Sequence, residues 1–378
     1  MRGGWTIGRL AGIDLRLHFT FPLIVALGAL QWGSAHGTSG ALFGALLMLA
    51  LFACVALHEL GHALAARHYG IPTREILLFP LGGVAFLARP ARRPAEELWI
   101  ALAGPAVNVV IAAALAIVIG VAPAALPGEA AGLLRASSAG PSPGTFLHWL
   151  LGANLSLVLF NLLPAFPMDG GRVLRALLAF RFGWLKGTRW AAAVGQGLAV
   201  AGGVWALLSG QLLLALLAAF VYFGAGQERT HAEARHVLES LRLADAYNRH
   251  ALVLAPGDRL SRVVHYLLTS YQPDFAVIDR AGVFAGVVTR ERALAIAATR
   301  ADDPFVLDFL ETRVPRLETH LTLAEAQEAL ADSGTTCGAV VEQGRFLGLV
   351  SQQDLAEAIG IAAALGAGRG DAEARSAA

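Results

Sequence analysis

Long apolar blocks fill the first 226 residues of the chain, with short polar segments between them. A helix that spans a membrane needs about 20 mostly apolar residues. Six blocks come close to this length and predict spanning helices at residues 17–32, 41–66, 97–121, 146–163, 189–208 and 211–226. A cleavable signal peptide is the alternative for the first block. The sequence GALQWGSAHG is a poor small-residue cleavage site, so we expect this block to be retained.

Residues 71–90, IPTREILLFPLGGVAFLARP, form a further apolar segment that is too short to span a membrane as a helix. Pro80, Gly82 and Gly83 interrupt it. The pattern predicts a β-hairpin or a re-entrant loop. Because lipid offers no partners to backbone polar groups, helices must cover this segment or it must line a cavity.

After residue 226 the pattern becomes that of a soluble region, and it contains an internal repeat. The two copies are residues 275–294, FAVIDRAGVFAGVVTRERAL, and residues 337–356, CGAVVEQGRFLGLVSQQDLA. Their alignment places Gly282 opposite Gly344 and Gly286 opposite Gly348. Each copy predicts a helix, two short strands around a turn, and a second helix. Such units bury their sheets only by packing against one another.

The predicted fold class is therefore an α-helical polytopic membrane domain followed by a soluble α/β pair. The membrane domain would have about six spans and a membrane-associated β-hairpin or sheet. The predicted boundaries are 1–226 for the membrane domain, 227–240 for a linker, 241–300 and 301–361 for the two repeats, and 362–378 for a disordered tail.

Composition agrees with a membrane protein, since 56% of the residues are hydrophobic and 15% are charged, against about 25% charged residues in soluble domains. The net charge of +1, with no basic arm of interleaved aromatic residues, gives no reason to expect a nucleic-acid partner. Cys54 and Cys337 are the only cysteines, so the chain has neither a disulfide framework nor a cysteine metal cluster.

Lysine and arginine collect on one side of the predicted spans. The segments on the other side hold only Arg135. Because basic residues favour the cytoplasmic face, we expect a multi-pass protein of the cell membrane with its N-terminus and its C-terminal repeats in the cytoplasm. The basic residues assigned to that face are Arg2, Arg9, Arg16, Arg67, Arg74, Arg89, Arg92, Arg93, Arg172, Arg175, Arg181, Lys186 and Arg189.

Two histidines and a glutamate interrupt the second apolar block, in LHELGH at 57–62. His58 and His62 are four residues apart, so they share one helix face and can bind one zinc ion. Glu59 points to a neighbouring side, where it can take a proton from a water that the zinc activates. Each ionisable group in mid-membrane costs about 2.5–3.5 kcal/mol, which a metal ion would offset. The alternative is that these polar side chains reach towards a helix end.

A catalytic zinc site usually has three protein ligands, and NLLPAFPMDGGR at 161–172 offers the third. Two prolines and a Gly-Gly pair interrupt the fourth block there, with Asp169 in the break. A carboxylate in that position favours a ligand. The alternative is that Asp169 caps the helix that follows, since aspartate is a good N-cap residue.

These residues together resemble the site-2 protease family of intramembrane zinc metalloproteases. The resemblance covers about residues 1–226 and includes FPLGGVA (79–85) and AGPAVN (103–108). It implies one zinc ion per chain held by His58, His62 and Asp169, and Glu59 as general base and acid. It also implies that Asn161 helps to hold the substrate or the oxyanion.

The same resemblance implies regulated intramembrane proteolysis, in which a transmembrane protein substrate is cut within the lipid bilayer. The hairpin at 71–90 is implied to pair with the unwound substrate as an added strand.

The repeat resembles a tandem CBS domain pair over about residues 240–360, which implies an adenine nucleotide as ligand. The second copy has Ser351 and Asp354 at the positions of a Ser/Thr and an Asp that hold phosphate and ribose. The first copy has Thr289 but Arg292 at the aspartate position, which argues against a nucleotide there. A purely structural module, or one that forms a homodimer through the CBS domains, is the alternative.

Two other functions compete with a protease. A metal transporter would have ionisable residues in several spans, whereas the fifth and sixth have almost none. A scaffold that has lost activity is disfavoured because His58, Glu59, His62 and Asp169 are all present.

Overall fold

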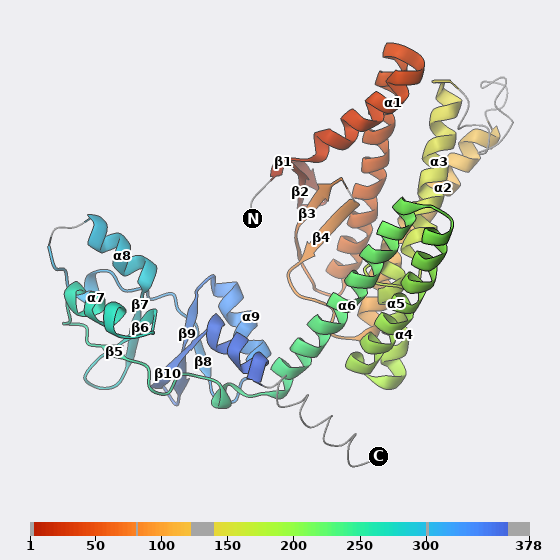
Figure 1. Cartoon of the computed structure of the whole chain (residues 1–378). Helices are drawn as coiled ribbons and strands as arrows, with labels where there is room; N and C mark the ends of the chain where they lie inside the picture. The colour runs from red at the N-terminus through yellow and green to blue at the C-terminus, as the bar shows by residue number, and fades with distance from the viewer. Residues whose placement is uncertain (1–3, 81, 122–139, 300–301, 362–378) are drawn as a thin grey trace. The chain divides into compact units, whose positions relative to one another are not determined.

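The computed structural model describes residues 4–80, 82–121, 140–299 and 302–361, and the chain divides into two compact units at residue 230. The first unit is mainly helical and the second is α/β (Figure 1). Both features of the predicted fold class are confirmed. The tail predicted at 362–378 and Arg135 lie outside the described residues.

Apolar helices dominate the first unit. Of the six helices in the described part of this unit, five are long and apolar enough to cross a membrane, and the exception is the short α4. Since the first of the five folds back on itself, this agrees with about six spans. The helices are α1 (Phe21–His68), α2 (Pro94–Val121), α3 (Pro143–Asn161), α4 (Asp169–Phe182), α5 (Trp184–Leu208) and α6 (Leu212–Ser240).

Helix α1 contains a sharp bend at Gly37, whose φ of 66° lies outside the helical range. The two halves then pack together as a hairpin (Figure 1). A Cβ on Gly44 would lie 2.1 Å from the carbonyl oxygen of Gly28, so only glycines permit this close approach. The first two predicted spans are therefore the two halves of α1.

The start predicted for the first span, residue 17, is wrong. Helix α1 begins at Phe21, and residues 17 and 18 belong to strand β2. Residues 13–18, IDLRLH, alternate between apolar and polar side chains, which is typical of a strand with one buried face. Ile13 and Leu15 are buried.

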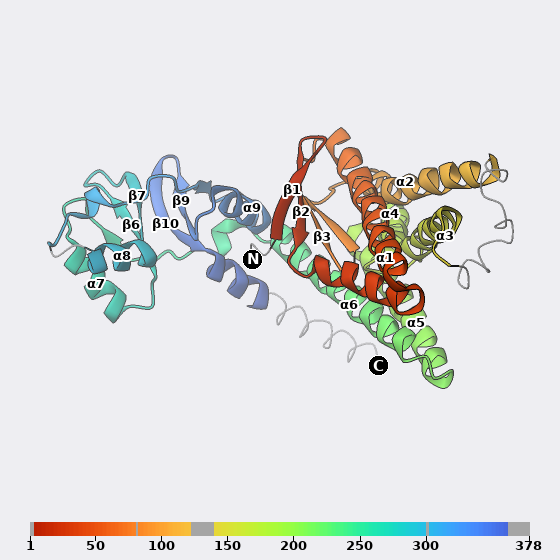
Figure 2. The ribbon, with the colours of Figure 1, turned by 90° about the horizontal axis from the view of Figure 1, so that it is seen from above.

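A four-stranded sheet packs against α1, and it contains the predicted hairpin. Its strands are β1 (Gly4–Leu10), β2 (Ile13–His18), β3 (Thr73–Phe79) and β4 (Gly82–Leu87), in that order across the sheet. Strands β2 and β3 are parallel, and the other two pairs are antiparallel. Ile76 and Leu78 pack with Phe52 and Val55 of α1 in one apolar cluster, and Figure 2 shows β1, β2 and β3 beside that helix. Strand β4 is left at an edge.

Helix α4 is fixed by a partly buried arginine, Arg175. Arg175 donates hydrogen bonds to Glu97 of α2, and its Nη1 lies 3.0 Å from Oε2 of Glu228 in α6. Its guanidinium also lies 4.9 Å from the centre of the Phe166 ring. These contacts hold three helices together at the level of α4.

The second unit contains two copies of one α/β motif. The first copy has a short 3₁₀ helix η1 (Leu243–Asp245), β5 (Val253–Leu254), α7 (Leu260–Thr269), β6 (Asp274–Ile278), β7 (Phe284–Thr289) and α8 (Arg290–Thr299). The second has η2 (Val306–Asp308), β8 (Arg316–Glu318), α9 (Leu323–Ser333), β9 (Cys337–Glu342), β10 (Arg345–Ser351) and a helix over 352–361.

The aligned glycines have matching roles in the two copies. Gly282 and Gly344 both turn with positive φ, 81° and 82°. A Cβ on Gly286 would lie 2.5 Å from the carbonyl oxygen of Glu311, and one on Gly348 would lie 2.2 Å from that of Asn248. The sheets β5-β6-β7 and β10-β9-β8 share an apolar cluster that includes Phe284 and Leu349. The predicted repeat is confirmed.

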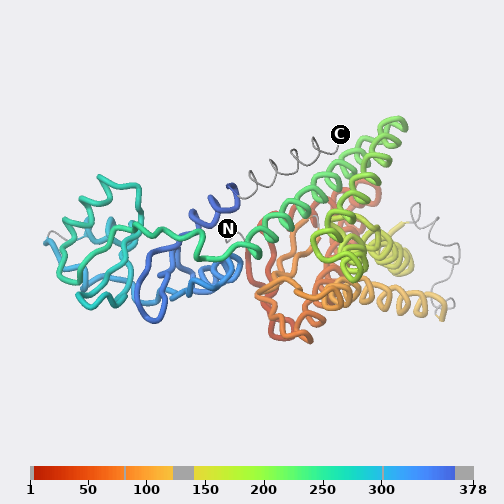
Figure 3. The backbone as a smooth tube through the Cα atoms, turned by 90° about the horizontal axis from the view of Figure 1, so that it is seen from below, coloured from red at the N-terminus to blue at the C-terminus, as the bar shows by residue number. Residues whose placement is uncertain are grey.

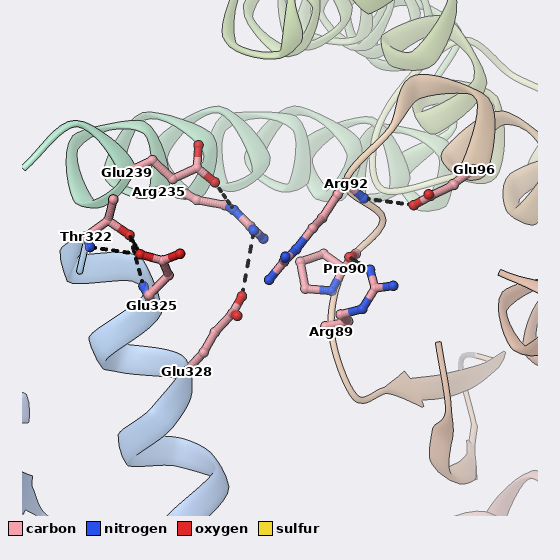
Figure 4. Close-up of polar contacts among 9 residues, drawn as sticks. All are labelled: Arg89, Pro90, Arg92, Glu96, Arg235, Glu239, Thr322, Glu325 and Glu328. Carbon is pink, nitrogen blue, oxygen red and sulfur yellow. Dashed lines mark hydrogen bonds and ion pairs between the residues drawn. The ribbon is translucent and has the colours of Figure 1, made fainter. Parts of the chain in front are cut away.

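The residues predicted as a linker, 227–240, lie in α6, which Figure 3 follows as one helix. Leu238 near its end belongs to the core of the second unit. Figure 4 shows Arg235 in ion pairs with Glu239 and with Glu328 of α9. It also shows the Thr322–Glu325 capping box that begins α9.

Candidate metal centre

Three side chains far apart in the sequence converge inside the helical unit. The Nε2 atoms of His58 and His62 are 3.1 Å apart, and Oδ2 of Asp169 lies 3.3 Å from the first and 3.2 Å from the second. All three residues are buried. The structure thus brings together two imidazole nitrogens and one carboxylate oxygen, a donor set that can hold a metal ion.

Helix geometry and a tight turn produce this arrangement. His58 and His62 are one turn apart on α1, while Asp169 is the first residue of α4. The turn before α4 is compact, since a Cβ on Gly170 would lie 2.2 Å from the carbonyl oxygen of Leu163. Met168 is the N-cap residue and makes no side-chain capping bond. The carboxylate of Asp169 therefore faces the histidines from the first turn of the helix.

The donor atoms fit a zinc ion. Two atoms bound at about 2.0–2.1 Å to one tetrahedral centre lie roughly 3.3 Å apart, close to the three separations here. The neighbouring wall is a glycine of the AGPAVN segment. A Cβ on Gly104 would lie 2.3 Å from Nε2 of His62 and 2.7 Å from Nε2 of His58. Any larger residue would therefore occupy the space of the donors.

The rings of both histidines are held through Nδ1. That atom of His62 lies 2.7 Å from the carbonyl oxygen of Ile100, and that of His58 lies 2.5 Å from Oδ1 of Asn108. With Nδ1–H donating, each Nε2 keeps a lone pair for a metal. Asn108 has no role in the sequence prediction, although AGPAVN contains it.

Glu59 lies beside the three converging groups and contacts the sheet. Its Oε2 accepts a hydrogen bond of 3.0 Å from the backbone N–H of Ala85 in β4. A Cβ on Gly83 of the same strand would lie 2.6 Å from Cγ of Glu59, so the strand leaves room for this side chain. The carboxylate is thus fixed by the edge strand.

Asn161 is the last residue of α3 and is partly buried. It precedes the turn that leads to Asp169. Its predicted role in holding the substrate or the oxyanion stays a prediction.

The second unit places Ser351 and Asp354 together. Oδ2 of Asp354 accepts hydrogen bonds from the backbone N–H and from the hydroxyl of Ser351, at 2.7 and 2.8 Å. Both residues line a pocket of about 200 Å³, which the buried Asp274 and Cys337 also line. Burial, followed by the Asp274 carboxylate, raises the pKa of the Cys337 thiol, so the cysteine is neutral at physiological pH.

The corresponding place in the first copy is different. Arg292 stands where the second copy has Asp354, and its Nε donates to the carbonyl oxygen of Phe309 at 3.1 Å. Its backbone N–H lies 3.3 Å from the hydroxyl of Thr289. The two copies therefore share a fold but not a donor set.

Family models match both the helical part and the α/β part of the chain. Residues 46–202 match the model of peptidase family M50, and residues 306–361 match that of the CBS domain. Zinc metalloprotease MJ0392 of Methanocaldococcus jannaschii is 31% identical over 355 residues, which cover 93% of this chain and 95% of that protein.

Two further comparisons cover a smaller share of this chain. Stage IV sporulation protein FB of Bacillus subtilis is 26% identical over 198 residues, or 51% of this chain and 62% of that protein. The solved structure of the site-2 protease from Methanocaldococcus jannaschii is 36% identical, with a TM-score of 0.42, and the match covers 60% of this chain and 95% of that one.

Proposed function

The chain belongs to peptidase family M50, the site-2 protease family of zinc metalloproteases, and on this basis we propose that it cuts a membrane protein within or near a transmembrane segment. His58, His62 and Asp169 would hold the zinc ion. The observation that supports this proposal is the convergence of these three buried donors, whose Nε2 and Oδ2 atoms lie 3.1–3.3 Å apart.

Zinc bound there would lower the pKa of a bound water towards about 7 and polarise the carbonyl of the scissile peptide bond. Glu59 would accept the proton released by the attacking water and pass it to the leaving nitrogen. Its position supports this role, because it follows His58 in the chain and the N–H of Ala85 orients its carboxylate. Asn161 would hold the substrate or the oxyanion.

The substrate would bind as an extra strand at β4. The backbone of a helical substrate is occupied by its own hydrogen bonds, so it has to unwind before hydrolysis. Strand β4 is at the edge of the sheet, and the N–H of Ala85 donates to Glu59. Val84 and Phe86 of this strand are exposed and offer apolar contacts. An added strand would give the freed backbone new partners next to the catalytic carboxylate.

The CBS pair would regulate the enzyme from the cytoplasm. The distribution of lysine and arginine supports a multi-pass protein of the cell membrane with both its N-terminus and its CBS domains in the cytoplasm. Ser351 and Asp354 would bind an adenine nucleotide in the pocket of the second copy, while Arg292 takes the corresponding place in the first. A homodimer would form through the CBS domains.

The proposal is tested by cleavage in liposomes. Purified full-length protein is reconstituted with a panel of single-span helices that carry a different tag at each end, and mass spectrometry locates any cut. We expect wild type to cut at least one helix within or near its span, a chelator to stop the reaction and added zinc to restore it. Glu59→Gln is the matched control, with the same fold and no general base. Cleavage that persists in Glu59→Gln, or that a chelator leaves unchanged, would contradict the proposed function.

A further inference from the structure

Two buried asparagines, Asn108 of α2 and Asn154 of α3, lie next to the metal centre without belonging to the donor set. Both side chains are fully buried. A buried amide without hydrogen bonds costs roughly 1–3 kcal/mol, so their partners show what they do. Asn108 contacts His58 on one side and Asn154 on the other, and Asn154 contacts the backbone of its own helix and the Sγ atom of Cys54 in α1.

The hydrogen bonds run in one direction because the last group can only accept. The carbonyl oxygen of Leu150 takes a bond of 2.8 Å from Nδ2 of Asn154. Oδ1 of Asn154 is then the acceptor that faces Nδ2 of Asn108, also at 2.8 Å. Oδ1 of Asn108 is left to face Nδ1 of His58. A reversed amide in either asparagine would set two donors or two acceptors against each other.

This order decides which nitrogen of His58 carries the proton. Since Oδ1 of Asn108 accepts, Nδ1 of His58 must donate, and the lone pair of the neutral ring lies on Nε2. Nε2 is the atom that faces His62 and Asp169. His62 is held in the same Nδ1–H tautomer by a single hydrogen bond, because its Nδ1 faces the carbonyl oxygen of Ile100 directly. A backbone carbonyl thus fixes the same tautomer in both histidines, directly for His62 and through two asparagines for His58.

We propose that Asn154 acts through Asn108 as a relay of positioning residues that fixes the tautomer and ring orientation of His58 for the metal. Helices α2 and α3 supply no ligand from the described residues, yet through this relay they hold the centre that α1 and α4 form. The hydrogen bonds of Asn154 within the described part of the chain go to Asn108, Cys54 and Leu150, so it is two hydrogen bonds away from the ring of His58. The inference rests on the zinc site of the proposed function.

The test measures how fast zinc leaves the protein. Full-length wild type, Asn154→Leu, Asn108→Leu and the double variant are purified in detergent, loaded with zinc and mixed with an excess of a chromophoric chelator. Loss of a partner of a metal-bound histidine usually weakens metal binding about 10–100-fold. We therefore expect zinc release about tenfold faster in Asn154→Leu and faster again in Asn108→Leu.

The double variant separates a relay from a purely structural role. If Asn154 acts only through Asn108, its removal has no further effect once Asn108 is gone, so the double variant should release zinc at the rate of Asn108→Leu. Two independent structural effects would instead multiply. Asn154→Ala removes the amide without adding a branched side chain and should match Asn154→Leu. Thr188→Val is the matched control, since Thr188 is a buried polar residue of α5 whose hydroxyl donates to the carbonyl oxygen of Trp184 in its own helix, and it should release zinc at the wild-type rate.

The possible results separate the two proposals. A wild-type protein that binds no zinc would overturn the metal centre itself. Wild type that binds zinc, together with unchanged release from both Asn154 variants, would overturn the relay alone. Multiplied effects in the double variant would also overturn it.

Discussion

Among the described residues of the helical unit, two clusters of largely buried ionisable side chains differ in whether they contain a cationic side chain. One is Arg175 with Glu97 and the partly exposed Glu228, and the other is His58, His62 and Asp169. Arg175 supplies N–H donors to Glu97 and Glu228, so that cluster contains its own cation, and we call it the compensated cluster. In the other cluster, the Nε2 atoms of His58 and His62 and the Oδ2 atom of Asp169 face one another at 3.1–3.3 Å. The first cluster joins helices, whereas the second offers a donor set that can hold a metal ion, so burial of charge alone does not identify a functional site.

The strongest test of this difference removes a proposed ligand. We expect Asp169→Ala to lose most of the zinc that wild type holds and all measurable proteolysis, because two histidines alone bind the metal weakly. Zinc per chain, measured by mass spectrometry of the metal after extensive dialysis, checks this. Zinc added to wild type should also raise its thermal unfolding midpoint, since a ligand that binds only the folded state stabilises it. Added zinc should leave the thermal unfolding midpoint of Asp169→Ala unchanged. Equal zinc in both proteins would contradict the ligand assignment.

The second test separates chemistry from metal binding within the same centre. Glu59 contacts β4 and lies outside the group of three donors. Glu59→Gln should therefore keep about one zinc per chain while its proteolytic rate falls roughly 10²–10⁴-fold, the usual contribution of a general acid–base group. The rate of cleavage of an established substrate and the zinc content are measured on the same sample. Zinc loss in this variant would make Glu59 a ligand.

The sequence predicts the metal centre better than the cluster around Arg175. Ionisable residues are rare in membrane helices, so HELGH and Asp169 are conspicuous in apolar blocks. Their spacing already places the two histidines on one face. Arg175 carries no comparable signal. From the sequence, its positive charge indicates only that its segment is expected on the cytoplasmic face. In the structure it pairs with glutamates from two other helices.

Long-range pairing limits the prediction of the sheet and of the relay in a similar way. The apolar segment at 71–90 is recognisable as a hairpin, but its parallel pairing with β2 joins strands that are separated by the whole of α1. No local pattern specifies that register. Asn108 and Asn154 are uncharged, lie on different helices and have no periodic signal, so only their contacts show that they reach His58.

The third test removes the positive charge from the compensated cluster. Oε1 of Glu97 accepts hydrogen bonds from two nitrogens of Arg175, and its Oε2 is buried with no partner among the described residues. Arg175→Met would leave this carboxylate unpaired, and breaking a buried ion pair in this way costs about 3–5 kcal/mol. We expect that loss of stability in detergent unfolding, with unchanged zinc per folded chain. Arg181→Met, at an exposed position on the same helix, is the matched control and should change stability by less than about 0.5 kcal/mol.

The smallest effect is expected for Glu228, the more exposed of the two carboxylate partners of Arg175. The side chain of Glu228 is 30% exposed, whereas that of Glu97 is 7% exposed, so water already stabilises part of its charge. Glu228→Gln keeps a hydrogen-bond acceptor for Arg175 and removes only the partly screened charge, which should cost about 1 kcal/mol or less. Unfolding of this variant is compared with that of Glu239→Gln, whose partner Arg235 lies on the same helix in an exposed pair. If Glu228→Gln destabilised the protein as much as Arg175→Met, the pair with Glu97 would not be the main contact of the arginine. The compensated cluster would then depend on α6 rather than on α2.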